Sequence, residues 1–371
     1  MKNIAVICEY NPFHNGHYEQ IKLIRERFGE CRMIALMSGS FVQRGIPAVY
    51  GKYVRAEAAL SCGCDLVLEL PAPYAFGSAE FFASGAVKTL EKLGGIDVLC
   101  FGSECGDIDL LSSIAENVSR DEYKNALKAL SDEDSHIRSA DSLYAEMFGS
   151  HLPDKPNDIL AVEYISALKK ANSGTVPFTY PRTSGFSASK TRNTLISGGD
   201  TSDMIPPAAK AVFDGHKVTD YRIYSALALY KLSATDEKTL SGFFGMNGGV
   251  AGCIKNRLPE ADTLDKLVSL CTSRKYTAAR IRRAVLCSLL GVTGSDMRAE
   301  PSYTVLLGSN ARGREYLSEI RRTSAIEIVT KPADAPGLPG YEITFKADAL
   351  LSVCRGEKIC DAVKTKPAMI G

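Results

Sequence analysis

The chain has 371 residues, of which 45% are hydrophobic and 23% are charged, and its formal net charge at pH 7 is +1. This composition is typical of a soluble protein, and the length allows two or three domains. A protein that bound nucleic acid over its whole surface would be more basic, so any RNA contact must come from a local patch. No apolar run reaches the roughly 20 residues that span a bilayer, and the N-terminus has no signal-peptide pattern. We therefore expect a cytoplasmic protein without membrane contact.

Eleven cysteines are scattered from Cys8 to Cys360, most of them inside apolar segments. The closest pair, Cys62 and Cys64, lacks the two-residue spacer and the second pair of a zinc site. We expect reduced core cysteines and no structural metal.

Short apolar runs alternate with helical patterns over the first 105 residues. Strands are predicted at residues 4–8, 33–37, 65–70 and 97–101, and helices at about 17–28, 52–61 and 78–93. This alternation predicts a parallel sheet with right-handed crossovers and helices on both faces. Such sheets bind ligands beyond the carboxyl ends of their strands. The loops that should converge there carry His14, His17, Gln43, Arg44 and Gly102.

The first motif, Asn-Pro-Phe-His-Asn-Gly-His at residues 11–17, lies between the first strand and its helix. Pro12 cannot continue the strand, and Gly16 lets the backbone come close to a ligand. His14 and His17 stand beside a helix N-terminus, where free amides and the helix dipole favour an anion such as a phosphate. For the bare pattern His-x-Gly-His, ordinary polar turn chemistry is the alternative.

A second motif follows a helix predicted at about 159–171 and an extended segment at 176–180. Within residues 182–192, hydroxyl side chains and a glycine precede a helix that should begin near Ala188, with Lys190 and Arg192 in its first turn. Cations at that position oppose the helix dipole, so a bound anion explains them better than helix stability does. The alternative is a plain helix cap with solvent-facing bases.

Both motifs resemble those of known families. His-x-Gly-His after the first strand resembles the signature of nucleotidyltransferases related to class I aminoacyl-tRNA synthetases, whose two histidines bind ATP phosphates. The longer string Glu-Tyr-Asn-Pro-Phe-His-Asn-Gly-His at residues 9–17 resembles the tRNA(Met) cytidine acetate ligase family. Residues 187–192 resemble that family's Ser-Ala-Thr-x-Ile-Arg, although Thr191 replaces its apolar residue. The resemblance also covers residues 37–48, 59–71 and 101–104.

The resemblance implies a Rossmann-like ATP-dependent ligase. It would activate acetate as acetyl-adenylate and pass the acetyl group to N4 of the wobble cytidine of elongator tRNA(Met), forming N4-acetylcytidine, with ATP and Mg²⁺ required. His14 and His17 would stabilise the transition state, and Lys190 and Arg192 would hold the β- and γ-phosphates. The expected nucleotide-binding positions are Ile7, Cys8, Glu9, Tyr10, Asn11, Pro12, Phe13, His14, Asn15, Gly16, His17, Tyr18, Glu19, Gln20, Gly102, Asn157, Arg182, Ser187 and Ser189.

The sequence changes character near residue 200. Glycines at 198–199 and prolines at 206–207 mark a boundary between an ATP-binding domain, residues 1–200, and a C-terminal domain, residues 201–371. The second domain is predicted to be mainly helical as far as about residue 295. Strand-like runs at 303–307 and 325–329 should close it.

A basic stretch between residues 266 and 295 contains six basic and no acidic residues. On a helix capped by Thr277, Arg280 and Arg283 should point away from the apolar face. A solvated basic helix end is one explanation, but Tyr276 and the family resemblance favour a tRNA-binding surface. Its expected members are Arg274, Lys275, Arg280, Arg282 and Arg283, with Lys52, Arg55 and the 302–330 region as the next candidates.

Two other functions fit parts of the sequence. A small-molecule adenylyltransferase would need no RNA, and this function would not explain the long basic C-terminal domain. An RNA-binding protein with an inert nucleotide fold would need neither the two histidines nor the basic second motif. No sequence feature assigns an oligomeric state.

Overall fold

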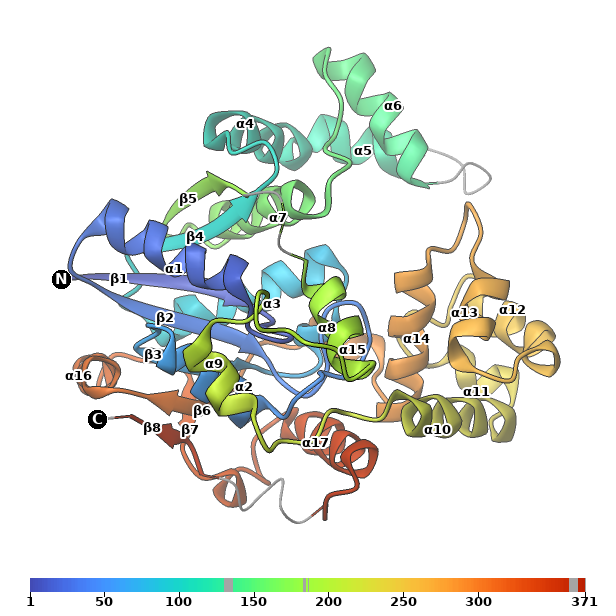
Figure 1. Ribbon diagram of the computed structural model, residues 1–371. Coiled ribbons are helices and arrows are strands. Elements are labelled where there is room, and N and C mark those ends of the chain that lie inside the picture. Colours follow the sequence, from blue (N-terminus) through green and yellow to red (C-terminus); the bar gives the residue numbers. More distant parts are fainter. Residues whose placement is uncertain (130–135, 183–184, 186, 360–365, 371) are drawn as a thin grey trace.

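The computed structural model describes residues 1–129, 136–182, 185, 187–359 and 366–370 (Figure 1). Within them, one eight-stranded sheet runs through the molecule in the order β5-β4-β1-β2-β3-β6-β7, with β8 beside β6. The strands are β1 (Lys2–Cys8), β2 (Cys31–Ser38), β3 (Leu66–Leu70), β4 (Val98–Ser103), β5 (Val176–Pro181), β6 (Tyr303–Ser309), β7 (Glu327–Val329) and β8 (Ala368–Met369).

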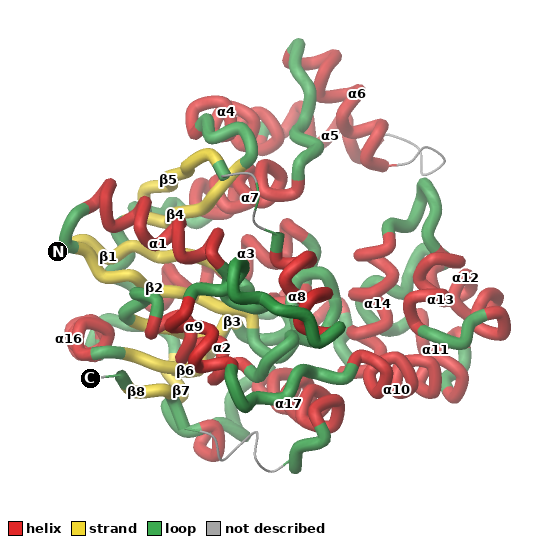
Figure 2. The backbone as a smooth tube through the Cα atoms, in the orientation of Figure 1, coloured by secondary structure: helices red, strands yellow, loops and turns green. Residues whose placement is uncertain are grey.

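Helices pack on both faces of the sheet (Figure 2). Alternate residues of β2 point to opposite faces, so that Ile34 and Leu36 belong to one apolar core while Met33 and Ala35 belong to the other. The helices before residue 215 are α1 (Asn15–Phe28), α2 (Lys52–Ser61), the 3₁₀ turn η1 (Tyr74–Phe76), α3 (Ala79–Leu93), α4 (Ile108–Ser119), α5 (Asp121–Ala129), α6 (His136–Phe148), α7 (Pro156–Lys170), α8 (Ala188–Ile196) and α9 (Pro207–Phe213).

The predicted parallel sheet is confirmed for β1 to β5. Strand β1 pairs in parallel with β2 and β4, β2 pairs with β3, and β4 pairs with β5. The strand order reverses at β1, because the chain continues to β2 and β3 on one side and to β4 and β5 on the other. The crevice beyond the carboxyl ends of β1 and β4 is therefore the place where such a sheet binds its ligand.

The C-terminal strands join this same sheet. Strand β6 pairs antiparallel with β3 and carries β7 and β8, so the sheet crosses the predicted domain boundary at residue 200. The strand-like runs predicted near residues 303 and 325 are present, but they extend the N-terminal sheet instead of closing a separate domain. The physical reason is that β3 would otherwise be an exposed edge, and the fully buried β6 covers it. The assignment of 1–200 and 201–371 as separate domains stays a prediction.

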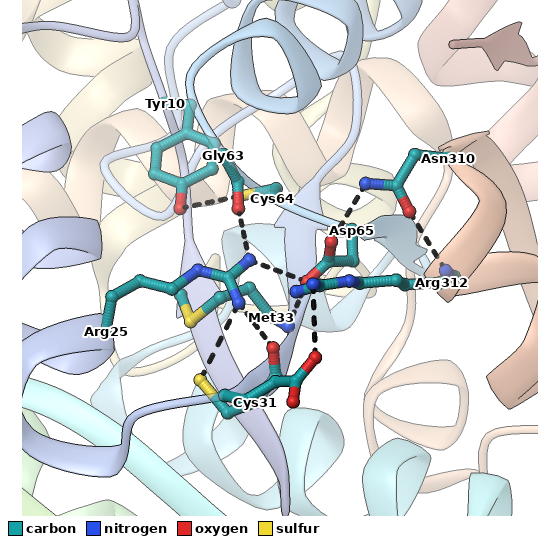
Figure 3. Close-up of polar contacts among 11 residues, drawn as sticks. Tyr10, Arg25, Cys31, Met33, Gly63, Cys64, Asp65, Asn310 and Arg312 are labelled. Carbon is teal, nitrogen blue, oxygen red and sulfur yellow. Dashed lines mark hydrogen bonds and ion pairs between the residues drawn. The ribbon is translucent and has the colours of Figure 1, made fainter. Parts of the chain in front are cut away.

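Asp65 fastens β3 to elements on both sides of it (Figure 3). Its Oδ2 accepts hydrogen bonds from Arg25 of α1 and from the backbone N–H of Met33 in β2, each at 2.8 Å. Its Oδ1 accepts one at 2.8 Å from Asn310, which follows β6. Asp65 is buried, and these donors compensate the loss of water around its charge. One carboxylate thus ties residues far apart in sequence to the middle of the sheet.

The predicted helical region after residue 200 is confirmed. Helices α10 to α14 contact one another and form a helical lobe, on the right of the sheet in Figure 1. Helix α17 packs against α10 and α14 and links this lobe to the sheet. The remaining elements are α10 (Tyr221–Ala234), α11 (Glu237–Ser241), α12 (Val250–Arg257), the 3₁₀ turn η2 (Leu258–Glu260), α13 (Leu264–Cys271), α14 (Ala278–Leu290), α15 (Gly294–Arg298), α16 (Ala311–Ile320), η3 (Pro332–Asp334) and α17 (Tyr341–Arg355).

The cysteines within the described ranges are all free thiols, and most are buried, as expected. Cys105, in the loop after β4, is an exposed exception, and Cys360 lies outside the described residues. Across the described part of the chain, no helix combines the length and apolar character needed to cross a bilayer.

Candidate active site

The two histidines of the first motif lie together at the start of α1, which begins at Asn15, about two residues earlier than predicted. The backbone N–H of His14 donates to Nδ1 of His17 (3.2 Å), and Nδ1 of His14 accepts from the backbone N–H of Gly16 (3.0 Å). These bonds explain the early start, because the imidazoles satisfy amides that the helix leaves free. The rings stack with centroids 3.8 Å apart.

Both histidines are neutral at pH 7. Burial, reinforced by the charges of Arg182 and Arg192, lowers the pKa of His14 to about 4. Burial lowers the pKa of His17 as well, with contributions from His14 and Arg182. Because each Nδ1 already accepts a hydrogen bond, the single proton of each neutral ring lies on Nε2. The pair therefore offers two Nε2–H donors without adding positive charge.

Aromatic side chains fix the position of His17. Its ring lies 4.9 Å from the ring of Tyr10 and 5.5 Å from that of Phe13, measured between centroids. Tyr10 and Phe13 have no exposed surface, so these two members of the expected nucleotide-binding stretch contact the core through their side chains.

The second motif lies beside the first. Arg192 donates from Nη1 to the carbonyl of Asn11 (2.7 Å) and from Nη2 to Oγ of Ser189 (3.0 Å). Ser187 caps α8 by accepting from the backbone N–H of Lys190 (3.3 Å). Arg192 is buried, whereas Lys190 is exposed and forms no ion pair with any described residue. Arg192 thus joins the two motifs, and Lys190 makes no comparable contact with a described residue. That both cations hold the β- and γ-phosphates stays a prediction.

The position where this chain departs from the family pattern is well packed. Thr191 is buried, and its hydroxyl donates to the carbonyl of Ser187 (3.1 Å). The polar atom that replaces an apolar residue is therefore satisfied. Thr183, Ser184 and Phe186 of the same segment lie outside the described residues.

The third group of expected residues meets at the end of β4. Arg182 donates from Nη1 to Oδ1 of Asn157 (3.3 Å), and its backbone N–H bonds the carbonyl of Ser103. A Cβ atom on Gly102 would lie 2.9 Å from Cγ of Arg182 and 3.0 Å from the hydroxyl of Tyr180, which explains the glycine. Since the Arg182 charge also lowers the pKa values of both histidines, this group lies near the first motif.

Glu104 was not identified from the sequence as a functional residue. Its carboxylate accepts hydrogen bonds from the backbone N–H groups of Asn157 and Asp158 at the start of α7. In return, Oδ1 of Asp158 accepts from the backbone N–H groups of Glu104 (2.7 Å) and Cys105 (3.1 Å). This reciprocal arrangement fixes Asn157 beside Arg182. The only sign of this arrangement in the sequence was Asp158, an acidic residue in the first turn of α7.

Lys52 and Arg55, the second choice for RNA contact, are buried, so that prediction was wrong for both. Arg55 has no exposed surface and donates to the carbonyls of Glu9 (2.6 Å), Ser38 (3.1 Å) and Gly39. It therefore fastens the carboxyl ends of β1 and β2. Burial lowers its pKa to about 10, so it stays charged at pH 7. Lysine and arginine usually lie at the surface, so their residue type suggested exposed side chains. No local sequence pattern reveals that carbonyl groups from distant strands accept hydrogen bonds from Arg55.

The five basic residues expected to bind tRNA do not form one uniform surface. Arg274 and Lys275 are exposed, Arg280 lies over the ring of Tyr276 (5.3 Å), and Arg282 pairs with Asp265 (3.1 Å). Arg283 does not point away into solvent as predicted. It is half-buried, Nη1 lies 3.5 Å from the carbonyl of Gln43, and burial lowers its pKa. The reason is that the loop after β2 packs onto this part of α14.

Two helix N-termini with converging histidine and cationic side chains, at the reversal point of a parallel sheet, define a nucleotide-binding site of the nucleotidyltransferase type. The family described as HIGH Nucleotidyl Transferase matches residues 1–365.

The chain is 32% identical to the tRNA(Met) cytidine acetate ligase of Acetivibrio thermocellus, over 90% of this chain and 89% of that protein. It is 33% identical to the enzyme of the same name from Clostridium perfringens, over 95% of each. The crystal structure of Thermotoga maritima TmcAL bound with alpha-thio ATP superposes with a TM-score of 0.91, at 28% identity and full coverage of both chains. The chain therefore belongs to the tRNA(Met) cytidine acetate ligase family, and the predicted fold class and family are confirmed.

Proposed function

We propose that this protein is an ATP-dependent ligase that acetylates N4 of the wobble cytidine of elongator tRNA(Met). It would first form acetyl-adenylate and pyrophosphate from acetate and ATP, and then transfer the acetyl group to the tRNA. Relatives named for this activity share 32 to 34% identity with most of the chain. The observation that carries the proposal is the contact from Arg192 to the carbonyl of Asn11, which joins the two motifs that resemble the family's phosphate-binding signatures.

The adenylation step needs positioning more than covalent chemistry. An acetate oxygen attacks the α-phosphate, and the bond to pyrophosphate breaks. The Nε2–H groups of His14 and His17 would stabilise the negative charge that develops on the phosphate oxygens. Lys190 would hold the departing phosphates, and Arg182 would approach them from the end of β4. Because the surrounding hydrogen bonds already fix the histidines, little reorganisation is needed during the reaction.

Mg²⁺ would reach the site with the nucleotide. Among the described residues, no group of three histidine, cysteine, aspartate or glutamate side chains is placed to hold a metal ion. Mg²⁺ commonly binds to substrate phosphates with one or two protein carboxylates and several waters. When bound, it would neutralise part of the phosphate charge.

The first half of the reaction can be tested without RNA. We expect ATP–pyrophosphate exchange that depends on acetate. Propionate should support it weakly and larger acids hardly at all, because one extra methylene changes binding by about 1–3 kcal/mol in a fitted pocket. Exchange should be measured with acetate, propionate, butyrate and a set of amino acids. A faster reaction with a bulky acid or an amino acid would rule out acetate as the substrate, and no exchange with acetate would contradict the adenylation step.

The exposed members of the basic stretch provide a test of tRNA binding. Replacing Arg274 and Lys275 together by glutamate should weaken tRNA binding, and should reduce the slope of log affinity against log salt by about 1 for each phosphate that the variant no longer neutralises. Acetate-dependent exchange should continue. Arg321 and Arg322 are a matched pair, adjacent and exposed after α16, and their double glutamate variant should bind tRNA normally. Loss of binding in that control instead would place the tRNA surface in the 302–330 region.

A further inference from the structure

The loop between β2 and α2, residues 41–50, is folded tightly against the protein and exposes one cation. Its turn is closed by hydrogen bonds from the backbone N–H of Gly45 to the carbonyl of Val42 (2.8 Å) and from Ala48 to Ser40 (3.0 Å). Gly45 has a φ of 73°, a conformation that other residues rarely adopt. Most of the loop is buried or half-buried, whereas Arg44 at its tip is exposed.

One side of this loop is attached to the first motif. The backbone N–H of Gln43 donates to Oε1 of Glu9 (3.1 Å), and the backbone N–H of Val49 donates to Oδ1 of Asn11 (2.8 Å). The position of the loop is therefore set by residues that immediately precede the two histidines.

The other side is attached to the helical lobe. Nη1 of Arg283 lies 3.5 Å from the carbonyl of Gln43, and the hydroxyl of Tyr221 donates to the carbonyl of Pro47 (2.9 Å). A Cβ atom on Gly45 would lie 2.7 Å from the backbone nitrogen of Arg283, so α14 and the loop are in direct contact. The tip of the loop thus lies where the nucleotide site and the basic stretch meet.

Arg44 is not paired with an acidic side chain in this place. Its guanidinium makes no hydrogen bond or ion pair with any part of the chain that the structure describes. It lies near Glu9 and Arg192: burial raises the pKa of Glu9 against an opposing contribution from Arg44, and burial together with Arg44 lowers the pKa of Arg192. Glu9 offsets part of the positive charge of Arg44 and Arg192, and a bound anion would offset the rest.

We propose that Arg44 binds a phosphate of the tRNA backbone next to the cytidine that is acetylated. This inference rests on the proposed function. The ATP phosphates would be held from the α8 and β4 side, by Lys190 and Arg182, whereas Arg44 approaches from the β2 side and adjoins α14. The target base has to reach the acetyl-adenylate while its backbone stays at the surface, and an exposed guanidinium suits a surface phosphate.

The test compares Arg44→Gln with Arg27→Gln. Arg27 is also an exposed arginine, near the end of α1, beside the amino ends of the strands and so at the opposite edge of the sheet. Arg44→Gln should lower kcat/KM for tRNA about tenfold, mostly through KM, and should reduce the salt slope of tRNA binding by about 1. Arg44→Lys should recover part of the affinity, since lysine restores the charge but lacks the planar guanidinium that can donate two parallel hydrogen bonds to a phosphate. Arg27→Gln should change neither quantity.

Acetate-dependent exchange without RNA is the second readout, and Arg44→Gln should retain it. Loss of exchange in this variant would overturn the inference and assign Arg44 to the ATP or acetate site. Unchanged tRNA kinetics and an unchanged salt slope would overturn it as well. Binding of tRNA can be measured without the acetylation reaction, so the role of Arg44 can be tested even if the protein shows no exchange. Failure of the wild-type protein to exchange with acetate would contradict the proposed function and not the role of Arg44.

Discussion

Replacing His17 by alanine is expected to slow acetate-dependent pyrophosphate exchange on the order of a hundredfold, and His14→Ala should have a similar effect. Removal of one donor that stabilises charge in the transition state typically costs roughly 3 kcal/mol. Both rings lie at the N-terminus of α1 with their Nδ1 atoms already engaged, so the donor lost in each variant is an Nε2–H. Affinity for tRNA should stay nearly unchanged, because the basic stretch lies on other elements.

His216→Ala is the matched control, since His216 is exposed after α9 and far from the motif in sequence. Circular dichroism must show that each variant is folded, because His17 packs on Tyr10 and Phe13. A His14 or His17 variant with a normal exchange rate would contradict the role of that histidine. A rate that fell equally in His216→Ala would show that the assay does not report on the site.

The histidine pair should also make stability depend on pH. Since the pKa of His14 is about 4 in the folded protein and about 6.5 when unperturbed, only the unfolded chain takes up a proton between these values. The free energy of unfolding should therefore decrease as the pH falls from about 6.5 to about 4. His14→Ala should show a weaker decrease over this range in urea unfolding measured at a series of pH values. An equal decrease in both proteins would contradict the lowered pKa.

The sequence predicted the parts of the site that are encoded locally. His14, His17 and Ser187 stand at helix starts within short runs of residues, and β1 to β4 are apolar runs between helical patterns, so neighbouring residues specify them. Lys190 and Arg192 could be located on α8 in the same way. The contact that joins the two motifs could not be predicted, because the carbonyl of Asn11 that accepts from Arg192 is 181 positions away in sequence.

Other features depend on contacts between distant segments. The apolar run at β6 indicates a strand, but nothing in it specifies that its partner is β3. Lys52, Arg55 and Arg283 look like surface residues by type, and their burial follows only from elements that pack over them. The sequence therefore predicted that the two motifs stand at helix starts, but not the pairing of β6 with β3 or the burial of these basic residues.

A buried ionic cluster between the sheet and the C-terminal helix should contribute strongly to stability. Nζ of Lys52, on α2, lies 2.7 Å from Oε2 of Glu69 on β3 and 2.6 Å from Oδ2 of Asp348 on α17. The hydroxyl of Ser40 donates to the other oxygen of Asp348 (2.5 Å). The side chains of Lys52, Glu69 and Asp348 are each at most 7% exposed. Burial raises the pKa of Glu69 to about 7 even beside Lys52, which shows how much the two carboxylates depend on that one cation.

Lys52→Met should lower the free energy of unfolding by about 3–5 kcal/mol at pH 8, because two buried carboxylates then lose their cation. Without that charge the folded pKa of Glu69 rises further above its unfolded value, so its ionisation destabilises the folded state more as the pH increases. The variant should consequently regain stability when the pH is lowered from 8 to 5, where protonation of Glu69 removes its repulsion with the other carboxylate. Urea unfolding at both pH values would measure this.

Lys346→Met provides the comparison on the same C-terminal helix. Lys346 pairs with Glu342 at 2.6 Å, but their side chains are 46% and 77% exposed, so this substitution should cost less than about 1 kcal/mol at either pH. Adding Asp348→Leu to Lys52→Met should restore part of the stability at pH 8, because it removes one of the two unpaired charges. If Lys52→Met cost no more than Lys346→Met, or lost stability equally at pH 5 and pH 8, the cluster would not hold the C-terminal helix to the sheet by charge.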